Sequence, residues 1–473
     1  MTEMIVTLTA QRAAFMAALP EPLALRKDRL RRAAAMVRDH AGRFCDALSE
    51  DFGHRSREQS MLTDIAGSIA PINHALKHLD GWAKAERRPV TFPLGLLGAR
   101  AWVEYSPKGV VGVIAPWNFP VNLVLGPLAG ILAAGNRAMV KTSEYTPVTA
   151  ALFEEIVGGY FAADELAFVS GGPDVGKAFA SLPFDHLLFT GATGVARHIL
   201  HAAADNLVPV TLELGGKSPV VIGQRADIAR ATERIALGKM LNAGQICLAP
   251  DYLLVRDIDE PQVVAGLKAA AARMYPTLLA NPDYTSLVSD RHVARLTEWL
   301  EDARAKGARI EVVNPANEDF AGSNSRKMPL HIVRDATDDM LVMQEEIFGP
   351  VLPIHRYDGI DDAIRQVNRR DRPLALYYFG PDAAERRHVL DRTISGGVTI
   401  DDVIFHVSMD DLPFGGVGAS GMGAYHGRDG FRTFSHARAV YHQPRIDVAK
   451  LAGLKAPYGA ASRKAAIRQI RRS

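Results

Sequence analysis

The chain has 473 residues, of which 48% are hydrophobic and 23% charged, a composition typical of a soluble globular protein with more than one domain. Its net charge of +2 gives no reason to expect a nucleic-acid partner. The two cysteines, Cys45 and Cys247, are too few for a disulfide framework and favour a reducing compartment, the cytoplasm. The N-terminus has no basic flank before a long apolar core, so we predict no signal peptide.

Helices are predicted for about the first 85 residues, where apolar side chains such as Leu30, Ala33 and Val37 recur at helical spacing. Ser56–Trp82 continues the pattern. The uncharged stretch 109–136 is long enough to suggest a membrane span. Its three prolines and two central asparagines instead favour a strand, a loop and a buried helix, so we predict no integral membrane segment.

Five apolar segments then alternate with four helical ones. The predicted strands are Val110–Ala115, Arg137–Lys141, Glu165–Ser170, His186–Gly191 and Val208–Glu213; the predicted helices are Val121–Ala134, one that starts at Thr146-Pro147, Pro173–Leu182 and Thr193–Asn206. This order predicts a parallel sheet covered on both faces, with ligands at the carboxyl ends of its strands. A second alternating region from Ser218 to about Val398 gives an α/β fold class throughout.

The candidate nucleophile is Cys247, which follows Asn242-Ala243-Gly244-Gln245-Ile246. Gly244 lets a ligand or another backbone segment approach closely. A catalytic thiol reacts as thiolate, so we expect the surroundings of Cys247 to lower its pKa. The alternative is a small buried hydrophobic residue, which is the commoner role of a free cysteine.

Two further residues have chemistry that would serve such a thiol. Glu213 closes an apolar strand before two glycines, where a desolvated carboxylate can accept a proton from water; the alternative is a strand-end salt bridge. Asn118, held between Pro116 and Pro120, is suited to stabilise an oxyanion; the alternative is a turn asparagine.

A phosphate site is indicated only weakly. The segment 189–194, FTGATG, runs from a strand into a helix, and its glycine turn can hold a phosphate by backbone amides. Lys141 and Glu144 lie just past another strand and could hydrogen-bond ribose hydroxyls, or form a solvated pair. Glu345 and Glu346 have no accompanying His or Cys cluster, so we predict no metal site. The glycine-rich segment 412–418 is either a substrate lid or a closely packed loop.

Six segments together resemble the aldehyde dehydrogenase superfamily, in the family's order and over nearly the whole chain up to about Tyr441. They are PWNFP (116–120), FTGATG (189–194), LELGGKSP (212–219), GQICLAPDY (244–252), EEIFGPV (345–351) and PFGGVGASGMGAYHG (413–427). The segments after the cysteine and at 372–379 resemble the class 3 branch. Within it, DFGHRSREQ (51–59) and HVSMDDLPFGG (406–416) are most similar to the bacterial coniferyl aldehyde dehydrogenases.

The resemblance implies a nicotinamide cofactor, NAD with NADP as the alternative, and a role for each matching residue. Cys247 is the nucleophile, Glu213 the general base, and Asn118 with the Cys247 amide the oxyanion hole. The implied cofactor-binding residues are Trp117, Lys141, Glu144, Gly191, Thr193, Glu346 and Phe348. Thr142 and Ala192 replace the family's usual proline and serine, and the second change removes a hydroxyl near the pyrophosphate.

The family fold implies a cofactor-binding domain (1–88 and 108–213), a catalytic domain (214–425), an oligomerisation arm (89–107 and 426–445) and a basic C-terminal tail (446–473). Arm strands, about Val90–Ser106 and Phe431–Tyr441, commonly pair between subunits, which predicts a homodimer or a dimer of dimers. The tail from Val448 has seven Lys or Arg and no acid. Its small apolar face, with Ile467 and Ile470, favours a solvated helix over weak contact with a membrane surface.

The implied substrate is a small-molecule aldehyde held in a mostly apolar pocket, which favours an aromatic or medium-chain aliphatic aldehyde over a charged one. The expected lining is Phe119, Asn122, Leu123, Ile246, Leu248, Phe405, His406 and Phe414. Alternatives are a fatty aldehyde, a coenzyme A-acylating enzyme, against which Glu213 speaks, and a non-catalytic oligomer, which should show damage at Cys247, Glu213 or Asn118.

Overall fold

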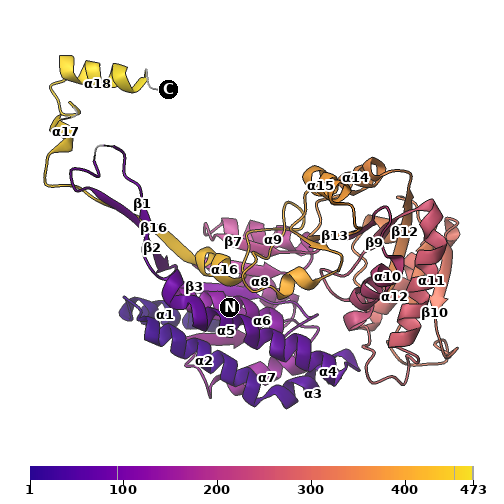
Figure 1. Cartoon of the computed structure of the whole chain (residues 1–473). Coiled ribbons are helices and arrows are strands. Elements are labelled where there is room, and N and C mark those ends of the chain that lie inside the picture. Colours follow the sequence, from indigo (N-terminus) through magenta and orange to yellow (C-terminus); the bar gives the residue numbers. More distant parts are fainter. Residues whose placement is uncertain (93, 452, 471–473) are drawn as a thin grey trace.

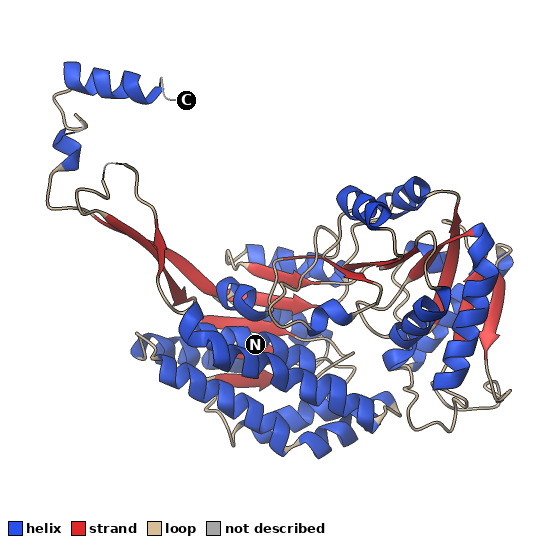
Figure 2. Cartoon of the chain, in the orientation of Figure 1, coloured by secondary structure: helices blue, strands red, loops and turns tan. Residues whose placement is uncertain are grey.

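The computed structural model describes residues 1–92, 94–451 and 453–470. Its strands form a six-stranded, a seven-stranded and a three-stranded sheet. Helices cover the two larger sheets, which lie beside each other, and the three-stranded ribbon projects away from them (Figures 1 and 2). The predicted α/β class is thus confirmed.

The six-stranded sheet has the order β15-β7-β6-β3-β4-β5, and all its pairings are parallel except that of β15. Its strands are β3 (Val110–Ile114), β4 (Arg137–Lys141), β5 (Leu166–Val169), β6 (His186–Thr190), β7 (Val210–Glu213) and β15 (Gly421–Met422). The chain runs outward from β3 to β5, then returns to β6 on the other side of β3. The strand order therefore reverses between β3 and β6, the position where open parallel sheets bind ligands.

Two groups of helices surround this sheet. The crossover helices are α6 (Asn122–Ala134), α7 (Pro147–Val157), α8 (Pro173–Ala180) and α9 (Thr193–Ala204); the N-terminal ones are α1 (Thr2–Ala17), α2 (Leu23–Asp39), α3 (Ala41–Phe52), α4 (Arg57–Ser60) and α5 (Gly67–Trp82). The N-terminal α2, α3 and α5 pack on the crossover helices. The uncharged stretch 109–136 forms β3 and the buried α6, which ends at Gly135 in the left-handed region (φ 90°). Among the described residues, no helix combines the length and apolarity needed to cross a membrane.

The predicted continuous helix Ser56–Trp82 is interrupted. A π-helical turn, η1 (Met61–Ala66), separates α4 from α5. The wider turn contains Asp64, whose buried carboxylate accepts hydrogen bonds from backbone amides at the start of α6. Apolar periodicity does not reveal such a turn, because its cause is a contact with a segment almost 60 residues away.

The seven-stranded sheet has the order β10-β11-β12-β9-β8-β13-β14 and is parallel except for β10. Its strands are β8 (Pro219–Ile222), β9 (Tyr252–Arg256), β10 (Arg309–Val313), β11 (Leu330–Arg334), β12 (Val351–Tyr357), β13 (Ala375–Phe379) and β14 (Gly397–Ile400). Its helical segments are α10 (Ile228–Met240), η2 (Leu241–Gly244), η3 (Asp257–Asp259), α11 (Glu260–Met274), α12 (Asp290–Ala305), α13 (Leu341–Gln344), α14 (Ile360–Asn368), α15 (Ala383–Arg392) and η4 (Phe405–Ser408).

The projecting ribbon is antiparallel, with β2 (Arg100–Pro107) between β1 (Glu86–Arg88) and β16 (Ser435–His442). Phe431, predicted to begin the second arm segment, instead lies in α16 (Gly427–Thr433) and is buried, because it packs on the rings of Trp82 and Tyr105. Beyond β16 the tail forms α17 (Val448–Leu451) and α18 (Ala460–Ile470) (Figure 1). Two of its basic residues, Arg471 and Arg472, lie outside the described residues.

Candidate active site

The loop that carries Cys247 follows α10 and is left-handed at three consecutive residues, Asn242, Ala243 and Gly244. A Cβ on Gly244 would lie 2.5 Å from the carbonyl oxygen of Gly349, so glycine is required here because another backbone segment approaches. The buried Gln245 side chain donates to the carbonyls of Asn242 (2.9 Å) and Ser286 (3.1 Å) and accepts from the Val288 amide. The loop is thus fixed from within, and Cys247 emerges from it partly accessible.

Glu213 ends β7 and is almost fully buried, and neither of its carboxylate oxygens has a hydrogen-bond partner among the residues that the structure describes. Burial raises its pKa well above the usual value, and the nearby carboxylate of Glu346 raises it further. A desolvated carboxylate with a raised pKa and no internal donor can accept a proton from a water molecule. This environment differs from the salt bridge that was the alternative for Glu213.

The pKa of the Cys247 thiol is raised well above its usual value, first by burial and then by Glu213 and Glu346. The expectation that its surroundings lower this pKa is therefore wrong for the chain by itself. The amides of Cys247 and Leu248 act in the opposite direction, because they donate to the sulfur. Three acidic groups share one desolvated region, so ionising any of them makes the next ionisation harder.

Because of this raised pKa, alkylation of Cys247 by iodoacetamide is expected to be slow at pH 7. It should accelerate by up to ~10-fold per pH unit towards pH 9, since the thiolate fraction of a thiol below its pKa rises with pH. Cys45, whose thiol pKa is also raised by burial and whose side chain is almost inaccessible, should react more slowly at every pH. Mass spectrometry of the two cysteine peptides measures both rates, and a Cys247 rate independent of pH above 7 would contradict the assignment of a high pKa.

Asn118 follows β3 and lies beside the cysteine loop. Its side-chain Nδ2 donates to the carbonyl of Gln245 (3.1 Å), two residues before Cys247. Its own carbonyl accepts from Arg55 (2.9 Å) and from the Asn242 side chain (3.1 Å). The structure therefore brings Asn118 and the cysteine loop together, although they are far apart in sequence.

Glu346 lies against the loop after β7. A Cβ on Gly215 would be 2.2 Å from its carboxylate, and the Gly216 amide donates to it. Burial raises the pKa of Glu346 to about 8, and Asp251 adds to this, whereas the Gly216 amide, Lys217 and Arg295 act against it. Glu346 is therefore held in place, while burial disfavours its charged form.

The segment that carries Glu346 is anchored by a buried ion pair between Lys217 and Asp251. Lys217 also donates to the carbonyls of Val342 (2.8 Å) and Glu345 (2.9 Å), and Asp251 accepts from the Ile347 amide (2.9 Å). Sequence reasoning assigned no role to either residue, although each lies inside a segment that carried the resemblance. A charged residue within an otherwise apolar, glycine-rich string was the available signal.

Five of the seven residues predicted to hold a dinucleotide lie at the carboxyl edge of the six-stranded sheet, at or after the ends of β3, β4 and β6. Lys141 ends β4; it is buried, lies 3.9 Å from the Glu144 carboxylate and donates to the Thr142 carbonyl. Gly191 follows β6, and its amide donates to the Glu213 carbonyl (3.1 Å). Thr193 opens α9 and donates to Ala419 (3.0 Å). Ala192 supplies no side-chain cap to α9, and its carbonyl accepts from the amides of Val195 and Ala196 (both 3.0 Å).

Trp117 and Phe348 contact each other edge to face, with ring centroids 5.2 Å apart. Trp117 also packs on His292 (5.0 Å) and approaches Phe52 (6.2 Å). The aromatic group thus links the β3 loop to the segment that carries Glu346.

The predicted substrate-lining residues differ in environment. Ile246, Leu248 and Phe414 are buried, whereas Phe405 is half exposed. His406 Nδ1 forms a hydrogen bond with the Thr399 hydroxyl (2.8 Å), and the His406 ring packs on Phe414. Phe119 is partly buried beneath the guanidinium of Arg55, Asn122 donates to the Thr63 carbonyl (2.7 Å), and Leu123 is partly buried one residue further along α6. The structure gathers some of these residues near the cysteine loop but does not itself outline an aldehyde pocket.

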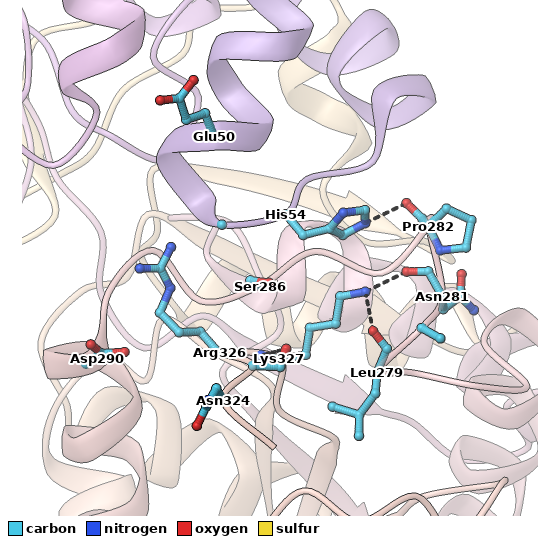
Figure 3. A pocket seen from close by; sticks show the side chains of 13 residues that line it. Glu50, His54, Leu279, Asn281, Pro282, Ser286, Asp290, Asn324, Arg326 and Lys327 are labelled. Atoms are coloured by element: carbon cyan, nitrogen blue, oxygen red, sulfur yellow. Dashed lines mark hydrogen bonds between the residues drawn. The ribbon is translucent and has the colours of Figure 1, made fainter.

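A separate cavity of about 720 Å³ lies between the end of α3 and the segments 279–290 and 324–327 (Figure 3). Its walls are mostly polar, and Lys327 fills one side by donating to the carbonyls of Leu279 and Asn281. None of the predicted site residues lines it. The cavity is therefore not the candidate active site.

The fold combines a parallel sheet with a strand-order reversal, a cysteine on a constrained loop and a buried carboxylate beside it. Residues 4–440 match the Aldehyde dehydrogenase family, and the chain belongs to that family. Its activity is accordingly the oxidation of an aldehyde.

Among curated relatives, the chain is 53% identical over 466 residues to a probable coniferyl aldehyde dehydrogenase of Caulobacter vibrioides, covering 98% of this chain and 96% of that protein. It is 54% identical over 442 residues to the coniferyl aldehyde dehydrogenase of Pseudomonas sp. strain HR199, covering 93% and 91%. Among solved structures, the substrate-bound Staphylococcus aureus AldH superposes with a TM-score of 0.89 at 33% identity and 99% coverage of both chains. Mycobacterium tuberculosis aldehyde dehydrogenase complexed with NAD⁺ gives a TM-score of 0.82 at 27% identity, covering 93% and 90%.

Proposed function

We propose that this protein oxidises a hydrophobic aromatic aldehyde of the coniferyl type to its carboxylic acid, with NAD⁺ as hydride acceptor and Cys247 as nucleophile. The observation that carries the proposal is the buried Glu213 carboxylate, which has no hydrogen-bond partner in the described part of the chain and lies close enough to Cys247 to raise the pKa of its thiol. Water activation by Glu213 and acylation of the Cys247 thiol both require the carboxylate and the sulfur to lie close together.

The carboxyl edge of the six-stranded sheet fits a nicotinamide dinucleotide. The uncapped start of α9 after Gly191 suits the pyrophosphate, and Lys141 with Glu144 suits the adenosine ribose. Glu346 and Phe348 suit the nicotinamide ribose and ring. When bound, the dinucleotide supplies the acceptor for the aldehyde hydride. Glu144 would accept from a ribose 2′-hydroxyl and repel a 2′-phosphate, which favours NAD over NADP.

In the first half of the proposed reaction, the Cys247 thiolate adds to the aldehyde carbonyl carbon, and the carbonyl oxygen becomes an oxyanion. The Asn118 side chain and the Cys247 amide donate to that oxygen; each donor of this kind typically contributes ~10²- to 10³-fold in rate. Loss of hydride from the adduct leaves a thioester on Cys247.

In the second half, Glu213 accepts a proton from a water molecule, whose oxygen attacks the thioester carbonyl. The carbon–sulfur bond then breaks, the acid leaves, and the thiolate of Cys247 returns. Burial supports this role for Glu213, because it raises the pKa of the carboxylate towards that of a base effective near neutral pH.

A coniferyl-type substrate is supported by two relatives above 50% identity that carry that name. It also agrees with the apolar character of Ile246, Leu248 and Phe414 around the cysteine loop. A fatty aldehyde would undergo the same chemistry and is the second candidate.

The experiment that tests this function follows NADH at 340 nm across a panel of aldehydes. Coniferyl and cinnamic aldehydes are expected to exceed succinic semialdehyde in kcat/KM by about 10-fold or more, because charge is costly to bury in an apolar pocket. Faster turnover of succinic semialdehyde would refute the substrate class. NADH release that depends on added coenzyme A would instead show an acylating enzyme, and no turnover with any aldehyde would refute the function.

We also propose a homodimer or dimer of dimers. Among the described residues, the outer edge of β16 in the projecting ribbon pairs with no strand, and the side chains of β16 are mostly exposed. A strand edge on a projecting ribbon is suited to pair with a second copy of the chain.

A further inference from the structure

A fully buried ion pair joins two residues at the start of the segment that contains the π-helical turn. Arg55 Nη2 lies 2.6 Å from Asp64 Oδ2, and neither side chain is accessible to solvent. Rings of Phe52 and Phe119 lie 4.8 and 5.0 Å from the Arg55 guanidinium carbon. Because apolar residues of similar volume usually stabilise a core as well as or better than a buried ion pair, stability alone does not account for this arrangement.

Each partner of the pair also binds the loop that contains Asn118. Arg55 Nη1 donates to the Asn118 carbonyl (2.9 Å), so one planar guanidinium spans the ion pair and the loop. Asp64 Oδ1 accepts from the amides of Val121 (3.1 Å) and Asn122 (3.3 Å). The pair therefore holds both ends of the short segment 118–122, in which Asn118 is the candidate oxyanion donor.

Gln59, between these two residues in sequence, binds the other loop of the site. Its Oε1 accepts from the Asn242 amide (3.0 Å), and its Nε2 donates to Asn242 Oδ1 (3.3 Å). Asn242 is left-handed (φ 51°), a conformation that costs energy for a residue other than glycine unless neighbours enforce it. The Asn242 side chain in turn donates to the Asn118 carbonyl (3.1 Å) and the Gln245 carbonyl (3.2 Å).

We propose that Arg55, Gln59 and Asp64, which we call the bracket, are positioning residues that set the distance between Asn118 and Cys247. The bracket contacts both loops from one segment. The Asn118 carbonyl accepts a hydrogen bond from Arg55 and another from the side chain of Asn242, which is itself bound to Gln59. The proposal rests on the proposed function, since it assigns the bracket to the oxyanion donor of that reaction. A displacement of about 1 Å between a donor and a reacting atom costs ~10²-fold in rate, so such a bracket has a measurable kinetic effect.

Three bracket variants and one matched control test this. Gln59→Met removes the amide pairing, Arg55→Lys keeps the charge but not the planar fork, and the double change Arg55→Met with Asp64→Leu removes both charges so that neither is left unpaired in the core. Arg57→Met is the control, because Arg57 lies in the same segment and forms only an exposed pair with Asp46. Thermal unfolding confirms that each protein folds, and Gln59→Met, which leaves the ion pair intact, is the variant least at risk of failing to fold.

The bracket variants are expected to lower kcat by ~10- to 100-fold with KM changed less than about 3-fold, and Arg57→Met is expected to match wild type. In an Asn118→Ala background the same substitutions should change kcat by less than about 3-fold, because two residues that act through one contact are not additive. An equal loss in both backgrounds would show that the bracket acts through general stability and would overturn the proposal.

Hydrogen exchange gives a readout that needs no activity, so it separates failure of this proposal from failure of the proposed function. Amides of 117–122 and 242–248 should exchange at least ~10-fold faster in the bracket variants than in Arg57→Met, while those of α11 and α12 stay unchanged. If the wild type oxidises no aldehyde but both segments exchange faster in the bracket variants, the positioning role is supported and the proposed reaction is wrong. Unchanged exchange in both segments would overturn the bracket whatever the activity.

Discussion

Replacing Cys247 with alanine is expected to abolish aldehyde-dependent NADH formation, with a loss in kcat/KM of roughly 10⁴-fold or more. The proposed route forms its first covalent bond at the Cys247 sulfur, and the chain's only other thiol, Cys45, lies buried in the N-terminal helical core. The measurement is the absorbance at 340 nm with coniferyl aldehyde at saturating NAD⁺. A mass shift on the wild-type Cys247 peptide after an acid quench would show the acylated thiol directly.

Cys45→Ala is the matched control for that substitution. Cys45 is buried in α3, so its loss leaves a small cavity and lowers the free energy of unfolding slightly, while kcat is expected to stay within about 2-fold of wild type. Thermal unfolding of both variants separates the two effects. If Cys247→Ala retained more than a few per cent of wild-type turnover, the covalent route would be wrong.

Much of the fold was predictable because short buried parallel strands are continuous apolar runs bounded by turn residues. Arg137–Lys141 was predicted as a strand at the residues where β4 lies. For β4 the boundary is local, since Gly135 ends α6 in the left-handed region just before the strand begins. The antiparallel β15 has two residues and no such pattern, so it was not predicted.

The site could be predicted only where chemistry and local motif coincide. Cys247, Glu213 and Asn118 each lie in a recognisable segment, and the family match over residues 4–440 spans all three. The raised pKa of Cys247 was not predictable, because it arises first from burial and then from Glu213 and Glu346, two carboxylates from distant parts of the chain. The electrostatic environment of a residue exists only after folding, so no single segment of the sequence contains it.

The same limit explains why the bracket was missed. The segment DFGHRSREQ (51–59) contributed only to the resemblance, and a helix was predicted over Asp64. The contacts of Arg55 with the Asn118 carbonyl and of Gln59 with Asn242 span 63 and 183 residues.

Replacing Glu213 with glutamine is expected to lower steady-state turnover by ~10²- to 10⁴-fold while leaving the first turnover largely intact. Without the base, water attacks the thioester slowly, so the acyl group accumulates on Cys247. Stopped-flow measurement should then show a burst of about one NADH per subunit followed by a slow phase, as expected when deacylation limits the rate. Glu345→Gln is the matched control. Glu345 is exposed and adjacent to Glu346 in the sequence, so this substitution is expected to leave kcat unchanged.

The pH dependence follows from the direction of the same shift. Since the pKa of Glu213 is raised in the folded protein, the fraction of active base in wild type, and with it kcat, should rise as pH increases from 6 to 9. At a pH above the ordinary carboxyl pKa, Glu213 releases its proton in the unfolded chain but retains it in the folded chain. In that pH range the burial of Glu213 costs stability, so Glu213→Gln should not lower Tm at pH 8. A variant with normal Tm, no burst and no acyl-Cys247 would show that Glu213 acts before the thioester forms. A normal Tm with a full burst and a stalled second turnover would place it at hydrolysis.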